Sequence, residues 1–233
     1  MTPQHRRDAA LSVAGALLVL ASLVIIWVSR LTVPRELYVS ELGAVGEPTA
    51  DAFRLALLLL VAGGVLVAWA VRDLRARTPI LRLGTPALSL ALACAGFFVA
   101  ANVPCTSGCP LPLGDTFTWQ DFTHTLAAVL AFAAACWAML QVAFAPGHRP
   151  ISRLSLAMAI AVGAIAAAGG LLSLARWNAE FGSRLELVAT TVGIAWLVVV
   201  GLVRAVGAVR PSSSMRLSAA GPTPRKLIGD SAD

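Results

Sequence analysis

Six long apolar stretches alternate with short polar segments along the chain. Each stretch is close to the roughly 20 residues that an α-helix needs to cross a hydrocarbon core about 30 Å thick. We therefore predict an all-α membrane protein, a bundle of six transmembrane helices. The predicted helices lie at about 9–29, 52–71, 83–103, 121–145, 152–175 and 183–203.

The six stretches fall within one predicted transmembrane domain, residues 9–207, which follows a short polar segment at residues 1–8. The tail at 208–233 is rich in Ser, Pro, Gly and Ala and lacks apolar periodicity, which is typical of disorder. The first apolar stretch is longer than the apolar core of a cleaved signal peptide, about 7–15 residues. We therefore predict that it remains in the protein as the first helix.

Basic residues are distributed unevenly between the two sides of the predicted bundle. If the N-terminus is cytoplasmic, 13 of the 18 basic residues face the cytoplasm and five face the other side. Short loops that are rich in Arg and Lys stay on the cytoplasmic side of a membrane. The sequence therefore predicts a plasma-membrane protein with both termini, including the tail, in the cytoplasm.

The composition indicates that lipid surrounds the protein. Hydrophobic residues make up 58% of the chain and charged residues 13%, with a mean hydropathy of +0.80, whereas about a quarter of a soluble domain is charged. The net charge of +6 does not indicate nucleic-acid binding, because no basic stripe with interleaved aromatic residues is present. Three histidines, His5, His124 and His148, are too few for a histidine-rich metal site. We predict no metal, no cofactor and membrane lipids as partners.

The middle of each predicted helix carries no Asp, Glu, Lys, Arg or His. Ionisable groups at this depth usually mark ion and proton routes, so their absence disfavours a pump or a proton-coupled transporter. Ala159, Gly163 and Ala167 recur at four-residue spacing in the fifth helix, a pattern typical of close helix packing. This face contacts either another helix of the bundle or a second copy in a homodimer. A separate protein partner is a further alternative.

Polar residues gather at the outer ends of the predicted helices. Asp121 and His124 share one face at the start of the fourth helix, because they are three residues apart. Together with Glu41 and Arg184 they form a candidate ligand-binding pocket. An Asp beside a His would fix its tautomer and raise its basicity, as acid–base catalysis needs. The alternative is structural, with Asp121 as a helix cap and His124 bonded to a backbone carbonyl.

Two cysteines, Cys105 and Cys109, stand four residues apart in the predicted outer loop between the third and fourth helices. The outer face of a plasma membrane is oxidising, and Gly108 between them allows a tight turn, so we predict a small disulfide ring. Free or redox-active thiols are the alternative.

Three short motifs resemble a known family. They are Ser-Glu-Leu-Gly-Ala at residues 40–44, the histidine that opens the fourth helix, His124, and Gly182-x-Arg184 at the start of the sixth. Over about residues 10–207 the chain resembles the prokaryotic six-helix membrane family called domain of unknown function 998. A more distant resemblance is to the Frag1/DRAM/Sfk1 group, which is linked to lipid handling and membrane organisation. These resemblances imply a six-helix bundle and no established activity.

The predicted function is that of a non-enzymatic protein that binds or organises a lipid or a partner protein through the outward-facing pocket. The alternative is a membrane-embedded enzyme that acts on a lipid or lipid-linked substrate at the outer leaflet, with His124 as acid and base. A facilitator-type transporter is the third candidate.

Overall fold

The computed structural model describes residues 2–111, 114–147, 149–175 and 177–209, and this part of the chain contains helices and no strands. Three single-turn 3₁₀ helices lie in the loops, η1 (Ser40–Gly43), η2 (Ile80–Arg82) and η3 (Gly114–Thr116). The long helices are α1 (Pro3–Thr32), α2 (Ala50–Ala70), α3 (Pro86–Asn102), α4 (Trp119–Ala143), α5 (Arg149–Leu174) and α6 (Ala179–Val209).

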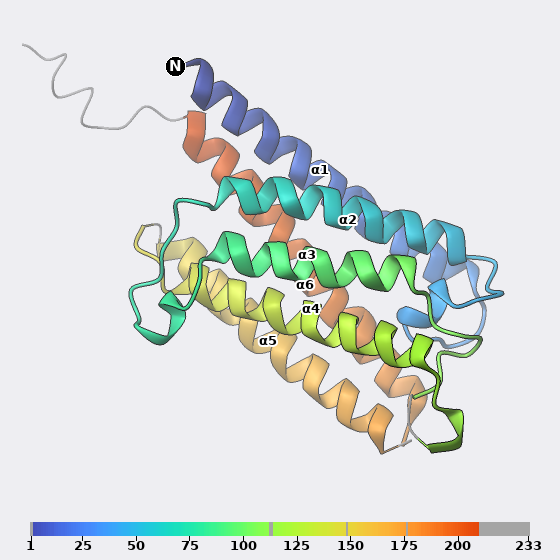
Figure 1. Cartoon of the computed structure of the whole chain (residues 1–233). Helices are drawn as coiled ribbons and strands as arrows, with labels where there is room; N and C mark the ends of the chain where they lie inside the picture. The colour runs from blue at the N-terminus through green and yellow to red at the C-terminus, as the bar shows by residue number, and fades with distance from the viewer. Residues whose placement is uncertain (1, 112–113, 148, 176, 210–233) are drawn as a thin grey trace, which may run out of the picture.

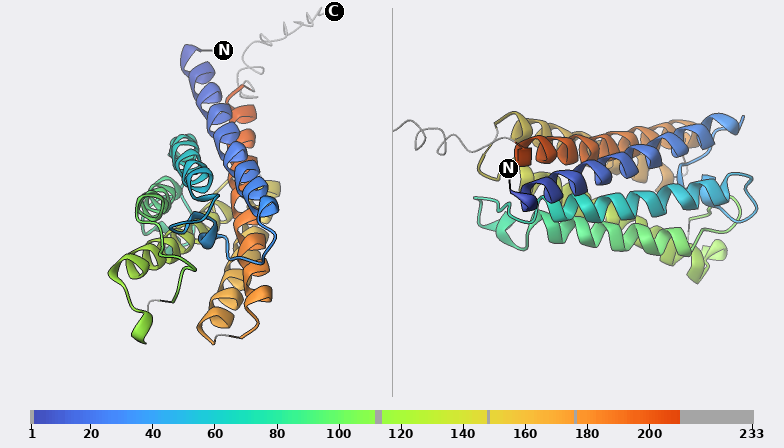
Figure 2. Two further views of the ribbon diagram at one scale, coloured as in Figure 1. Left: turned by 90° about the vertical axis from the view of Figure 1, so that its right-hand side faces the viewer. Right: turned by 90° about the horizontal axis from the view of Figure 1, so that it is seen from above.

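The six long helices run up and down, side by side, and form a closed ring (Figures 1 and 2). Each helix packs against the next in the chain, and α6 also packs against α1, which closes the ring. Helix α1 begins and α6 ends at the same end of the bundle (Figure 1). We call the opposite end, where α2, α4 and α6 begin, the site end.

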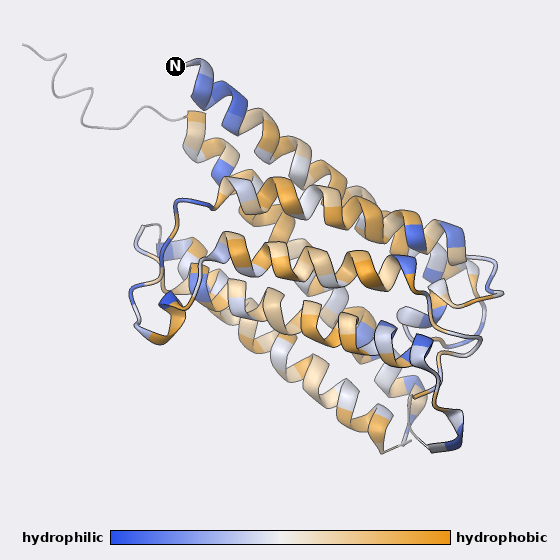
Figure 3. Cartoon of the chain, viewed as in Figure 1, coloured by the Kyte–Doolittle hydropathy of each residue, from blue (hydrophilic) through white to orange (hydrophobic). Residues whose placement is uncertain are grey.

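The surface of the bundle is that of a membrane-embedded protein. Large apolar side chains such as Leu17, Leu92 and Ile160 are exposed along the helices, and polar residues concentrate at the two ends (Figure 3). Soluble proteins rarely expose so much contiguous apolar surface. Among the described helices, five are long and apolar enough to span a membrane, and α3, with 17 residues, is shorter. A helix of that length spans roughly 25 Å, at the lower limit for a membrane crossing.

Several helices begin at residues other than the predicted ones, because local caps outweigh the hydropathy pattern. Helix α1 begins at Pro3, where the Thr2 side chain accepts a hydrogen bond from the His5 backbone N–H. Helix α3 begins at Pro86 rather than at residue 83, because Gly84 adopts a φ of 86° that ends the preceding turn. Helix α6 extends to Val209, and the rest of the predicted tail lies outside the described residues.

The three small residues at four-residue spacing in α5 do not form one continuous contact face, although Gly169 further along the helix is buried against α6. Ala159 is buried, but Ala167 is exposed and a methyl group added at Gly163 would have no neighbour within 4 Å. A close approach of two helices lies at Gly63 in α2, where an added methyl carbon would lie 2.7 Å from the backbone oxygen of Gly15 in α1. Helix rotation, which spacing alone does not specify, decides which small residues are used.

Candidate functional site

An elongated cavity runs along the inside of the ring. Side chains from all six long helices line it, and its volume is about 100 Å³, several times the space that one water needs. On α4 the lining residues recur every three or four positions, on one helical face. They are His124, Ala128, Phe132, Ala135 and Met139. This stripe extends roughly 22 Å along α4, at 1.5 Å per residue.

Small side chains create the space inside the ring. Ala128 and Ala135 on α4 alternate with the larger Phe132, and Gly193 faces the cavity from α6. A methyl carbon added at Gly193 would have only the Met139 methyl group within 4 Å, at 3.9 Å. The walls are otherwise apolar over most of the length, so the cavity suits a hydrocarbon group.

Polar groups line the cavity at the site end. They are Ser40, the first residue of η1, His124, in the first turns of α4, and Glu186, near the start of α6. A Glu186 carboxylate oxygen accepts a hydrogen bond of 2.8 Å from the Val39 backbone N–H, which attaches the first loop to α6. One end of an apolar cavity therefore carries a carboxylate and an imidazole.

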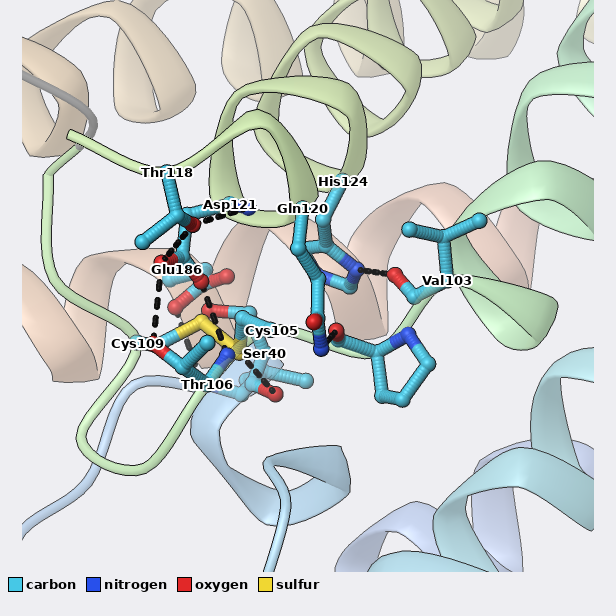
Figure 4. The surroundings of a disulfide bond; sticks show 12 residues. Ser40, Val103, Cys105, Thr106, Cys109, Thr118, Gln120, Asp121, His124 and Glu186 are labelled. Atoms are coloured by element: carbon cyan, nitrogen blue, oxygen red, sulfur yellow. Dashed lines mark hydrogen bonds between the residues drawn. A yellow bond between two sulfur atoms is a disulfide. The ribbon is translucent and has the colours of Figure 1, made fainter.

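The orientation of His124 is fixed by the backbone of the loop after α3. Its Nδ1 lies 2.8 Å from the carbonyl oxygen of Val103 (Figure 4). A carbonyl oxygen can only accept, so Nδ1 carries the hydrogen and Nε2 is the acceptor in the neutral ring. Val103, rather than Asp121, therefore selects the tautomer.

Asp121 organises the loop above the cavity. Its two carboxylate oxygens accept hydrogen bonds from the backbone N–H of Thr106 at 2.7 Å, the Thr106 hydroxyl at 2.8 Å and the Thr118 hydroxyl at 2.6 Å (Figure 4). The Thr118 side chain in turn accepts from the Asp121 backbone N–H, so it caps α4. Asp121 is fully buried, and it binds the loop rather than capping the helix, since the cap is Thr118.

The loop held by Asp121 is closed by a disulfide between Cys105 and Cys109. The Cys105 carbonyl oxygen also accepts from the Val45 backbone N–H at 3.0 Å, so the ring connects the first loop to α4. A ring nitrogen of His124 and the two sulfur atoms lie within 4.8 Å of one another. Since the sulfurs are bonded to each other, neither offers the thiolate that binds a metal ion.

Glu41 lies beside the site rather than in it. Its neighbour Ser40 lines the cavity, whereas Glu41 is half-buried in η1. Burial raises the pKa of the Glu41 carboxyl above its ordinary value. The nearby Arg35 guanidinium lowers that pKa, but by less than burial raises it.

Arg184 lies away from the cavity. Its exposed guanidinium forms ion pairs with Glu180, one turn earlier in α6, and with Glu36 at 3.7 Å. It lines a second hollow of about 250 Å³ between the end of α1 and the start of α6, together with Arg30. The structure thus brings His124 to the cavity and Asp121 to the loop above it, and places Arg184 elsewhere.

Glu186 is the cavity residue that the sequence analysis did not select. A signal for it exists in the sequence, since Glu186, Thr190, Gly193 and Leu197 recur at helical spacing and share one face of α6. An acidic residue at the start of a helical face that otherwise carries small and apolar residues is expected to point into the bundle. Arg184, two residues earlier, lies on a different face of α6.

Comparison with known proteins identifies the chain at the level of a family. No curated protein and no solved structure matches it. A family model, described as protein of unknown function DUF998, matches residues 12–203, which include all six long helices in whole or in large part. The chain therefore belongs to the DUF998 family.

Proposed function

We propose that this protein is a non-enzymatic, multi-pass plasma-membrane protein that binds an amphiphilic lipid inside its helical ring. The hydrocarbon chain lies along the apolar stripe of α4, and the polar head lies among Ser40, His124 and Glu186. The observation that carries this proposal is the cavity lined by all six long helices, apolar along its length and polar at the site end. Ligand sites commonly combine apolar walls with a few polar groups that fix orientation.

The dimensions favour one hydrocarbon chain. The stripe from His124 to Met139 is roughly 22 Å long, close to the length of a long alkyl chain. The cavity volume of about 100 Å³ is narrow for such a chain, so the surrounding side chains and helices must move apart slightly to admit it. Beyond Met139 the bundle closes, since the Ser89 hydroxyl donates to the Gln141 amide oxygen at 2.7 Å, and both residues are buried. A continuous polar route, which a facilitator needs, is not supported by this arrangement.

Catalysis is the less supported alternative. A general base is commonly oriented by a second polar side chain, and Asp121 is the residue that the sequence offers for this role. Its carboxylate is instead occupied by Thr106 and Thr118. A binding site needs only the shape and the polar end of the cavity.

A cavity-filling substitution tests the proposal. Ala135→Leu places a larger side chain in the cavity, whereas Ala133→Leu, two residues earlier on the exposed face of α4, makes the same change outside it. We expect wild type and Ala133→Leu to retain one amphiphile in native mass spectra after release from lipid nanodiscs. We expect Ala135→Leu to lose at least about tenfold in occupancy, since steric exclusion of that size corresponds to about 1.4 kcal/mol.

Two results would contradict lipid binding in the cavity. One is a wild-type protein that carries no amphiphile at any lipid composition. The other is equal occupancy in Ala135→Leu and Ala133→Leu, which would place the bound lipid on the outer surface of the bundle.

The proposal includes six membrane crossings with the site end outside the cell. The excess of basic residues at the other end supports this orientation. We expect a membrane-impermeant maleimide to label Asp115→Cys in intact cells, and to label Arg75→Cys only after permeabilisation, since both positions are exposed at opposite ends. Labelling of Arg75→Cys in intact cells would invert the topology.

A further inference from the structure

The polar end of the cavity carries an acidic side chain, Glu186, that has no cationic partner among the described residues. Glu186 is the charged residue among the described residues that line the cavity, and no Arg or Lys is among them. No ion pair joins Glu186 to another described residue. An ionised carboxylate away from water is unfavourable unless a positive charge or hydrogen-bond donors compensate it.

The groups around Glu186 supply hydrogen-bond donors from the first loop, at Val39 and Ser40, but no positive charge. Because His124 donates through Nδ1 to Val103, its Nε2 is an acceptor in the neutral ring. Glu41 lies close enough for its own negative charge to act on Glu186. The nearest arginine on the same helix, Arg184, is exposed and paired with Glu180 and Glu36. A ligand head that lies here meets an acidic side chain and no cationic one.

We infer that the bound amphiphile carries an amine head group, with its ammonium placed between the carboxylate of Glu186 and Nε2 of His124. This inference rests on the proposed lipid binding and names its chemical class. An ammonium has three N–H donors, and a charge-assisted hydrogen bond is about twice as strong as a neutral one. A phosphate or carboxylate head would meet Glu186 as a like charge and would find no arginine or lysine among the described lining residues.

Three single-chain probes of equal length test the inference on the wild-type protein. Dodecylamine, dodecanol and dodecyl phosphate are titrated against the protein in phosphatidylcholine nanodiscs, and occupancy is read by native mass spectrometry. We expect dodecylamine to bind about tenfold more tightly than dodecanol, and dodecyl phosphate to bind most weakly. Equal binding of amine and alcohol, or tighter binding of the phosphate, overturns the inference.

An isosteric substitution identifies the residue responsible. Glu186→Gln keeps an oxygen that can accept from the Val39 backbone N–H but removes the charge, so we expect the preference for amine over alcohol to fall close to one. Glu180→Gln makes the same change on an exposed residue of the same helix, outside the lining of the cavity, and should leave the preference unchanged. A preference that persists in Glu186→Gln overturns the assignment, and the wild-type ranking tests the head-group class even if that variant does not fold.

The outcomes separate this inference from the proposed function. If none of the three probes binds, or if Ala135→Leu does not reduce their binding, the cavity is not a lipid site and the proposed function fails. If the alcohol and the phosphate bind as well as the amine, the cavity holds lipid but the amine assignment fails. Displacement of dodecylamine by phosphatidylethanolamine, but not by phosphatidylglycerol, would identify a membrane phospholipid as the source of the amine; displacement by single-chain amines alone would identify a free amphiphile.

Discussion

Replacing Asp121 with alanine is expected to lower the free energy of unfolding by about 3 kcal/mol. The change leaves the Thr106 backbone N–H and two threonine hydroxyls without their buried acceptor, and a buried donor that loses a charged partner costs about 1.5–3 kcal/mol. The loss also frees the loop that the Cys105–Cys109 disulfide closes above the cavity. Unfolding by a denaturing detergent, followed by circular dichroism or tryptophan fluorescence, measures the change.

Asp115→Ala is the matched control for this measurement. Asp115 is an exposed acid in the same connection between α3 and α4, and exposed substitutions usually change stability by less than about 0.5 kcal/mol. A stability of Asp121→Ala equal to that of Asp115→Ala would show that the hydrogen bonds of Asp121 do not hold the site end together.

Replacing Gly63 with alanine is expected to destabilise the bundle by about 2 kcal/mol, although alanine is the better helix former. The new methyl carbon would lie 2.7 Å from the Gly15 backbone oxygen and 2.9 Å from the Val19 backbone nitrogen. Backbone atoms of α1 cannot move independently of their helix, so α1 and α2 must separate, and overpacking of this kind costs about 1–3 kcal/mol. The same detergent-unfolding assay provides the measurement.

Gly163→Ala provides the control, because an added methyl carbon there has no neighbour within 4 Å. We expect it to leave stability unchanged or to raise it slightly, since alanine favours the helix over glycine by up to about 1 kcal/mol. If Gly163→Ala proves the more damaging of the two, α5 uses its small residues at an interface, as the homodimer alternative would require.

The sequence indicated individual residues of the site, but not their hydrogen-bond partners. His124 and Asp121 could be selected because this chain has few polar residues at the ends of its apolar helices. Their partners could not be inferred, since each depends on the path of a loop. The Val103 carbonyl binds the His124 ring, and Thr106 and Thr118 occupy Asp121. An i, i+3 spacing places two side chains on one face but does not make them partners.

The sequence by itself determined that lipid rather than water surrounds the helices, and approximately where in the chain the helices lie. The free energy of transfer from water to lipid is a property of each residue by itself. The thickness of the bilayer sets the number of residues over which this free energy must be summed. Thus the predicted and observed long helices agree in number and in most of their length. Their ends differ where local features decide, such as the Thr2 cap of α1 and the positive φ of Gly84 before α3.

Only the tertiary structure decided which polar groups meet inside the ring. The bond between Val39 and Glu186 joins residues 147 positions apart, and its formation depends on the rotation of α6 and on the closure of the ring by α1. The same rotation directs Glu186 into the cavity and Arg184 away from it, although the two are only two residues apart. Hydropathy does not determine helix rotation in a bundle surrounded by lipid, because close packing of small residues and a few buried hydrogen bonds set it.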